Sequence, residues 1–178
     1  MEYGEFLGDE LRVDIAADDG DVIQAGDMRF TVLYLPGHTR CSVGYYCEQH
    51  RLLLSSETIG VYDGKELIVP SYLVSYSDSI NSINRVCELQ IDKLLSPHLG
   101  ILDEQQTRFF LQNCRSSNEK AAMFIKGLLE QGITDDEIIA RFKEIYWQGY
   151  IRDIYPEDAV NLNTSIMIGL IRKELIQP

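Results

Sequence analysis

The chain has 178 residues, of which 16 are basic and 28 acidic, giving a formal net charge of −12. Hydrophobic residues make up 45% of the chain and charged residues 25%, a composition typical of a folded domain that excludes a wholly disordered one. The acidity argues against nucleic acid and against an anionic membrane as partners, because both attract clustered Lys and Arg. No apolar run approaches the roughly 20 residues that cross a bilayer.

The N-terminal stretch and the cysteines point to a cytoplasmic protein. The acidic residues 1–15 (MEYGEFLGDELRVDI) lack the basic start and the apolar run of a signal peptide. Cys41, Cys47, Cys87 and Cys114 form neither CxxC pairs nor a dense disulfide framework. We therefore expect reduced thiols.

Short β-prone runs alternate with turn residues in the first hundred positions. β-branched and aromatic residues predict strands, and polar turns between them indicate an antiparallel meander. The expected strands are 22–24, 28–35, 43–47 and 51–55, followed by a helix within 71–89 and a buried strand at 91–95.

Helical patterns dominate the rest of the chain. We expect helices over about 104–113, 118–131 and 156–175, and one that begins at Thr134, where Thr134 and Glu137 have the spacing of a capping box. The sequence thus predicts an α/β (α+β) fold with a part at 1–103 and a helical extension at 104–178. Because no flexible tether separates the two parts, we expect the helices to pack on the β-rich part.

Two of the three histidines follow predicted strands. His38 comes after Leu35-Pro36-Gly37, and His98 comes after the strand that ends near Leu95, whereas His50 lies in a hairpin turn and is expected at the surface. Glu57 follows a third strand. Loops at strand ends are where metal ligands are commonly mounted, and two imidazoles with one carboxylate are zinc or iron ligands. Spacing alone equally allows His38 to be an ordinary hydrogen-bonding histidine.

Five segments in order strengthen the metal interpretation. They are DGDVI (19–23), LPGHTRCSVG (35–44), LLLSSETIG (52–60), YSDSI (76–80) and LSPHLG (95–100). In order and spacing this series resembles the metallo-β-lactamase superfamily, whose corresponding motifs include PGHT, a Gly-Asp pair after a strand, and a late PGHG.

The resemblance implies the C-terminal half of an αββα sandwich hydrolase that carries one or two metal ions. Zinc is the expected metal, with iron or manganese as alternatives. Transferred position by position, the metal ligands would be His38, Glu57 and His98. The family hydrolyses its substrates with metal-activated water, and a small ester, thioester, lactone or phosphoester is the expected substrate. No residue is assigned a catalytic role beyond metal binding.

Departures from the family leave the activity open. The upstream H-x-H-x-D-H motif is absent, since no histidine precedes His38. Ser56-Glu57 stands where the family has Gly-Asp. The Glu57 side chain is one methylene longer than aspartate, which displaces its carboxylate. Ser56 replaces a glycine that could adopt a special backbone angle. A complete two-metal site is therefore not expected from this chain alone, although three ligands could hold one ion.

Two alternatives follow for the partner and the function. In the complete family fold, the other half of the sandwich covers one apolar face of the sheet. We therefore expect a missing N-terminal half or a homo-oligomer to cover that face here. A degenerate half-domain acting as a dimerisation or scaffold module is the non-catalytic alternative. The aromatic group Tyr146, Trp147, Tyr150 and Tyr155 predicts helix packing, with pocket lining as the second interpretation.

Overall fold

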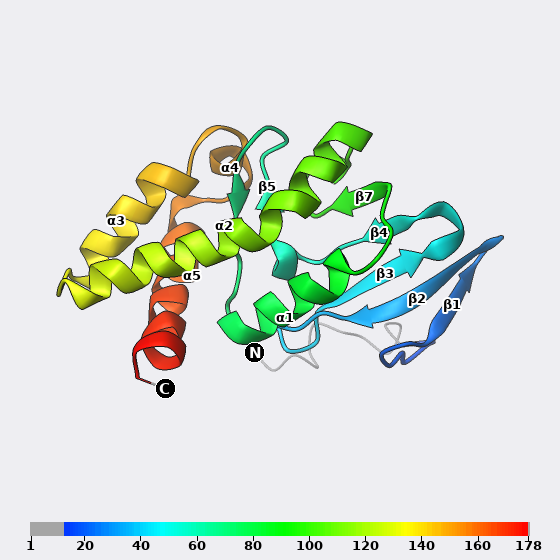
Figure 1. The fold of residues 1–178 in the computed structure, drawn as a ribbon, viewed down its shortest axis with the longest axis horizontal. Helices are drawn as coiled ribbons and strands as arrows, with labels where there is room; N and C mark the ends of the chain where they lie inside the picture. Colours follow the sequence, from blue (N-terminus) through cyan, green and yellow to red (C-terminus); the bar gives the residue numbers. More distant parts are fainter. Residues whose placement is uncertain (1–12, 178) are drawn as a thin grey trace.

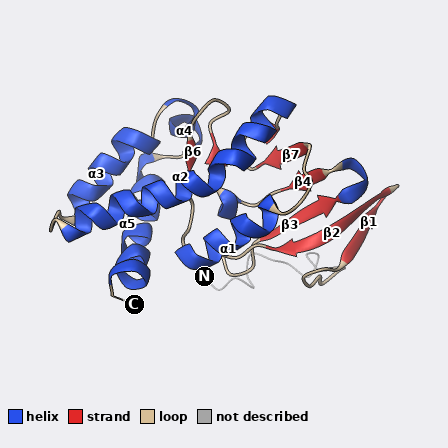
Figure 2. Ribbon diagram, in the orientation of Figure 1, coloured by secondary structure: helices blue, strands red, loops and turns tan. Residues whose placement is uncertain are grey.

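The computed structural model of the protein describes residues 13–177. Residues 1–12 of the acidic N-terminal stretch therefore lie outside the described residues. A six-stranded sheet occupies one end of the molecule and most of the helices gather at the other (Figures 1 and 2). The strand order is β1-β2-β3-β4-β7-β8. Strands β1 to β4 form an antiparallel meander, β7 pairs with β4 in parallel, and β8 pairs with β7 in antiparallel fashion.

The strands are short and mostly lie where the sequence predicts them. The sheet contains β1 (Val22–Ala25), β2 (Met28–Tyr34), β3 (Val43–Cys47), β4 (Leu52–Leu54), β7 (Lys93–Ser96) and β8 (Gly100–Ile101). A separate two-stranded ribbon pairs β5 (Val61–Tyr62) with β6 (Ile68–Val69). The sequence pattern missed β5, β6 and β8, because two residues are too few to show a period.

One face of the sheet is covered by helices. Leu33, Leu53 and Leu94 point to that face and pack against Ile83 of α1 (Tyr76–Cys87) and Phe110 of α2. All five side chains are at most 4% exposed. This core joins the β-rich part to the first half of the helical extension, as expected from the absence of a tether.

The long helix α2 (Glu104–Glu130) is continuous, so the predicted break between residues 113 and 118 is wrong. Polar side chains in this segment bond back to the preceding turn. Ser116 Oγ donates to the Asn113 carbonyl at 3.1 Å, and Asn118 Nδ2 donates to the Cys114 carbonyl at 2.9 Å. These bonds satisfy the side chains without interrupting the helix.

The second half of α2 joins a second core with the remaining helices. These are α3 (Asp135–Tyr146), the unpredicted short α4 (Gly149–Ile154) and α5 (Glu157–Ile171), which continues into a π-helical turn at Arg172–Ile176. Thr134 caps α3 by accepting a hydrogen bond from the Glu137 amide, as predicted. The Glu137 carboxylate, which was expected to complete the capping box, pairs instead with Arg141 of the same helix. Among the buried residues of this core are Ile125, Ile138, Phe142 and Ile168.

The chain's C-terminal turn is tied back to the β-rich part. The Glu174 carboxylate accepts hydrogen bonds from the Tyr76 and Ser77 amides at the start of α1, at 3.1 and 2.9 Å. A carboxylate at a helix start is favourable because it satisfies free N–H groups. No helix among residues 13–177 is both long and apolar enough to cross a membrane.

Candidate functional site

The three predicted ligands meet at one edge of the sheet. Nε2 of His98 lies 3.1 Å from Oε1 of Glu57, and Nε2 of His38 lies 3.8 Å from Oε2 of the same carboxylate. Their side chains are 20%, 23% and 34% exposed for His38, Glu57 and His98, so the cluster is half-buried and remains open to solvent. The Glu57 carboxylate therefore lies between the two imidazoles.

Sheet topology explains the convergence. Strands β2, β4 and β7 all run in one direction, because β2 and β4 are each antiparallel to β3 and β7 is parallel to β4. Their carboxyl ends consequently lie at one edge, and the loops that follow them carry the three side chains. This edge is where open α/β sheets generally place their ligands.

Thr58 and Ser71 hold His38 in place. The fully buried Thr58 hydroxyl donates to the Leu35 carbonyl at 2.7 Å and accepts from the His38 amide at 3.3 Å. The Ser71 carbonyl lies 2.9 Å from Nδ1 of His38. The Ser71 hydroxyl also lies 2.8 Å from Nδ1, so one residue contacts this nitrogen through two oxygens, and Nε2 is the ring nitrogen on the Glu57 side.

His98 sits in a left-handed backbone conformation. Its φ of +65° is uncommon outside glycine and is stabilised by the tight turn between β7 and β8. Tyr150 of α4 donates its hydroxyl to the His98 carbonyl. The helical extension thus fixes the histidine from the other side of the site.

Tyr155, directly after α4, enters the cluster. Its hydroxyl donates to Oε2 of Glu57 at 2.7 Å and lies 3.2 Å from Nε2 of His98. Burial, followed by the hydrogen bond to the Glu57 carboxylate, raises the pKa of Tyr155 well above its usual range. The hydroxyl therefore stays protonated at neutral pH and serves as a donor.

The aromatic group of the extension thus has two roles. Tyr146 stacks on Phe142 with ring centroids 4.4 Å apart, as helix packing requires. Tyr146 and Tyr155 also line a pocket, in agreement with the second interpretation. Tyr150 and Tyr155 contact the site as well, which the sequence pattern did not indicate. No local pattern marks them, because the partner residues are 52 to 98 positions away in the chain.

Ser56 needs no special backbone angle. Its φ of −102° is ordinary for any residue, and its hydroxyl accepts a hydrogen bond from the Thr58 amide at the start of the turn Glu57–Ile59. The expectation that serine loses a conformation available only to glycine is therefore wrong at this position.

Two imidazoles and a carboxylate are suitable zinc donors, but their arrangement is incomplete. No group of three or more His, Cys, Asp or Glu side chains is placed to hold a metal ion in the part of the chain that the structure describes. Each Glu57 oxygen faces one imidazole, which makes two donor pairs rather than one set of three. The described residues alone therefore do not fit a complete metal centre.

Three curated sequences match about half of the chain. The acyl-coenzyme A thioesterase MBLAC2 of Gallus gallus is 33% identical over 92 residues, which cover 49% of this chain and 32% of that protein. The Homo sapiens protein of the same name is 31% identical over 100 residues, covering 54% of this chain and 35% of that protein. The chain thus spans about a third of the length of these relatives. No family model matches.

Solved structures share the fold over nearly the whole chain. A metallo-β-lactamase family protein of Thermus thermophilus has a TM-score of 0.62 at 17% identity, covering 92% of this chain and 50% of that one. A β-lactamase domain protein of Burkholderia ambifaria has a TM-score of 0.61 at 13% identity, covering 88% and 46%. An archaeal superfamily protein of Sulfolobus tokodaii has a TM-score of 0.53 and covers 90% and 52%.

These structural matches include helices of the extension, because they cover about nine-tenths of this chain and the β-rich part ends at residue 103. The motifs around His38, Glu57 and His98, the sequence matches and the structural matches therefore all point to the same superfamily. The chain is a partial member of the metallo-β-lactamase superfamily, carrying about half of its fold.

Proposed function

We propose that the chain supplies one half of the active site of a metal-dependent hydrolase that acts on thioesters. The supporting observation is the convergence of His38, Glu57 and His98 at the carboxyl ends of three strands that run in the same direction. The thioester class is taken from the name of the curated relatives, which are acyl-coenzyme A thioesterases. Zinc is the proposed metal, and iron and manganese are the alternatives.

The residues of this chain position donor atoms. Ser71 contacts Nδ1 of His38 and so leaves Nε2 on the Glu57 side, and Tyr155 holds one Glu57 oxygen through a hydrogen bond. Tyr150 fixes the turn that carries His98. Outer partners of this kind commonly change metal affinity by about 10- to 100-fold.

The remaining ligands would come from the other half of the sandwich. On the sheet face opposite α1 and α2, the apolar side chains of Val32, Tyr45, Leu54 and Leu95 are neighbours across four strands. Tyr45, Leu54 and Leu95 are only half-buried. A second sheet packed on this row would bury it, as in a two-sheet sandwich. An N-terminal half on a longer polypeptide is the proposed partner, and a second copy of the chain is the alternative.

A zinc titration tests the site. Isothermal titration of the chain with zinc is expected to show binding that weakens at least tenfold in a His38→Ala/His98→Ala double variant. His50→Ala is the matched control, since His50 is the remaining histidine of the sequence and lies in the turn Glu48–His50. Equal zinc affinity in all three proteins, or no binding in any, would overturn the proposed metal role.

A hydrolysis assay tests the reaction. With zinc present and a polypeptide that carries H-x-H-x-D-H added, the chain is expected to hydrolyse acyl thioesters faster than the double variant does; without that polypeptide, the chain is expected to show little hydrolysis. Zinc binding without hydrolysis under either condition would favour the scaffold alternative. Light scattering of the free chain at increasing concentration distinguishes a second copy from a separate half as the partner.

A further inference from the structure

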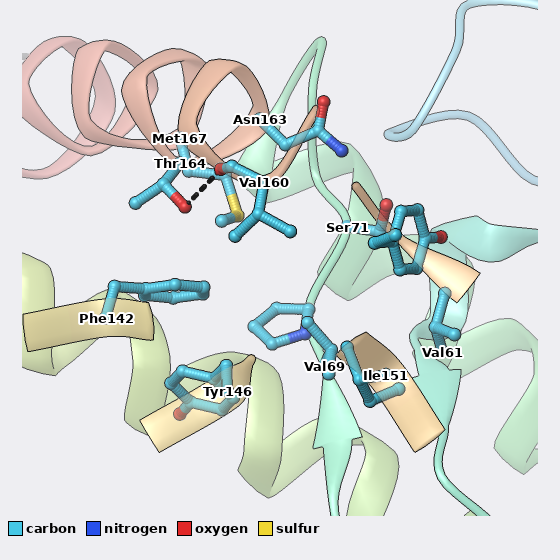
Figure 3. Close-up of a pocket in the computed structure, with 12 residues that line it drawn as sticks. Val61, Val69, Ser71, Phe142, Tyr146, Ile151, Val160, Asn163, Thr164 and Met167 are labelled. Atoms are coloured by element: carbon cyan, nitrogen blue, oxygen red, sulfur yellow. Dashed lines mark hydrogen bonds between the residues drawn. The ribbon is translucent and has the colours of Figure 1, made fainter. Parts of the chain in front are cut away.

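A narrow apolar pocket adjoins the histidine and carboxylate cluster. It lies between the β5–β6 ribbon and the helices α3, α4 and α5 (Figure 3). Apolar side chains such as Val61, Phe142, Ile151 and Met167 point into it. The polar residues Asn163 and Thr164 also line it, and the Thr164 hydroxyl donates to the Val160 carbonyl at 2.8 Å.

Two residues belong both to the pocket and to the cluster. Tyr155 lines the pocket and donates its hydroxyl to Glu57, and Ser71 lines the pocket and contacts Nδ1 of His38. The apolar space therefore begins where the polar cluster ends. The two shared residues place the pocket next to the position that a reacting carbonyl would take at the cluster.

We propose that this pocket binds the unbranched acyl chain of the substrate, an assignment that rests on the proposed thioesterase function. The mostly apolar lining disfavours the polar, anionic part of an acyl-coenzyme A, and the net charge of −12 of the whole chain offers no general attraction for phosphates. The pocket holds only about 30 Å³ of free space, which suits the end of a methylene chain better than a ring. Pockets of this type, mostly apolar with a few polar groups at one end, are the usual form of small-molecule sites.

The chain contains its own reporter of pocket occupancy. Trp147 is the single tryptophan of the sequence, and its indole N–H donates to the Tyr155 carbonyl at 2.9 Å. A ligand that shifts Tyr155 or its neighbour Tyr146 is expected to change tryptophan emission. Binding can thus be measured without catalysis.

The test uses unbranched methyl ketones of increasing length, which are neutral and cannot be hydrolysed. Affinity from Trp147 fluorescence is expected to rise about fourfold per added methylene until the pocket is filled. In Val160→Phe the rise should stop at a shorter chain, and the longest ketone should bind at least tenfold more weakly than to the parent protein. In Val160→Ala, which adds space and cannot overpack, the rise should continue to a longer chain.

Leu162→Phe is the matched control. Leu162 lies on the same helix as Val160 but is 62% exposed, so its substitution should leave the length dependence unchanged. Circular dichroism checks that each variant is folded. Affinity that does not depend on chain length, or an identical profile in all three variants and the parent, would overturn the pocket assignment.

The two proposals fail separately. Length-dependent ketone binding without thioester hydrolysis would contradict the thioesterase function and retain an apolar-chain site. Hydrolysis that requires His38 and His98, combined with ketone binding that ignores Val160, would retain the function and reject this pocket as the acyl site.

Discussion

The hydroxyl of Tyr155 donates a hydrogen bond of 2.7 Å to Oε2 of Glu57, across 98 positions of sequence. This bond connects the helical extension to the edge of the sheet, between two residues that a local pattern cannot relate. The extension is therefore part of the site as well as part of the hydrophobic core.

Tyr155→Phe is expected to lower the free energy of unfolding by about 1 kcal/mol. A hydrogen bond to a charged group contributes more than a neutral one, but water can reach the partly exposed Glu57 once the hydroxyl is gone. Urea denaturation at neutral pH measures the change. Tyr34→Phe is the control, because the Tyr34 hydroxyl donates to the Arg40 carbonyl in an exposed loop; a loss in Tyr155→Phe no larger than in this control would contradict the prediction.

Gly127→Ala is expected to raise stability by about 0.5–1 kcal/mol. Gly127 lies inside α2, and a Cβ at this position would meet no atom within 4 Å, so alanine adds helix propensity without a clash. Gly37→Ala is the opposite case. Its φ is +136° and a Cβ there would lie 2.1 Å from Ser79 Oγ and 2.7 Å from backbone atoms of the same residue.

Thermal unfolding of both glycine variants checks this pair. We expect the melting temperature to rise in Gly127→Ala and to fall in Gly37→Ala, with a loss of about 2 kcal/mol or more in the second. Changes of the same sign in the two variants would show that the backbone around one of the glycines is arranged differently.

Cys87 is expected to be the reactive thiol of the protein. The hydrogen bond with the Cys114 side chain, aided by Arg115 and opposed by burial, lowers the pKa of Cys87 to about 7. Cys87 is also exposed, whereas Cys114 is buried. The rate of alkylation by iodoacetamide should therefore rise with pH to a midpoint near 7 at Cys87.

Peptide mass spectrometry after timed alkylation measures this profile, with the exposed Cys41 as an internal reference in the same sample. Cys114→Ala should move the midpoint upward and slow the reaction at neutral pH about threefold, because lost thiolate outweighs gained nucleophilicity. A midpoint at or above the usual cysteine range in the parent protein would refute the effect of Cys114.

Asp19 is expected to stabilise the protein at neutral pH and not in strong acid. Hydrogen bonds from the Arg85 guanidinium and the Tyr34 amide, both 2.7 Å long, lower the pKa of Asp19. A lowered pKa means that the contribution is complete above the ordinary aspartate pKa and disappears as the pH falls through the folded-state value. Because both side chains are partly exposed, the contribution is about 0.5 kcal/mol.

Asp19→Asn should accordingly lower the urea midpoint at pH 7 and have no effect near pH 2. Asp92→Asn is the control, because Asp92 and Arg51 form an exposed pair 3.4 Å apart whose loss should not be measurable. If Asp19→Asn lowered the urea midpoint equally at pH 7 and pH 2, the loss of stability would not come from the charge of the Asp19 carboxylate.

Much of the local structure follows from the sequence. The meander formed by β1 to β4 is predicted because β-prone runs are separated by turn residues, and α3 is predicted because Thr134 caps it. The division into 1–103 and 104–178 stays a prediction. The continuous α2 was missed; the Ser116 side chain bonds back to the Asn113 carbonyl, so this polar residue is accommodated without a break.

Local sequence patterns identify the loops that follow the strands, and hence the three candidate ligands His38, Glu57 and His98. The packing of the folded chain sets one imidazole beside each oxygen of the Glu57 carboxylate and brings in Tyr155. The difference lies in the distance along the chain over which each effect acts. Strand and helix propensities act over a few neighbouring residues, whereas the contact between Tyr155 and Glu57 depends on how a helical extension packs against a sheet edge 98 positions away.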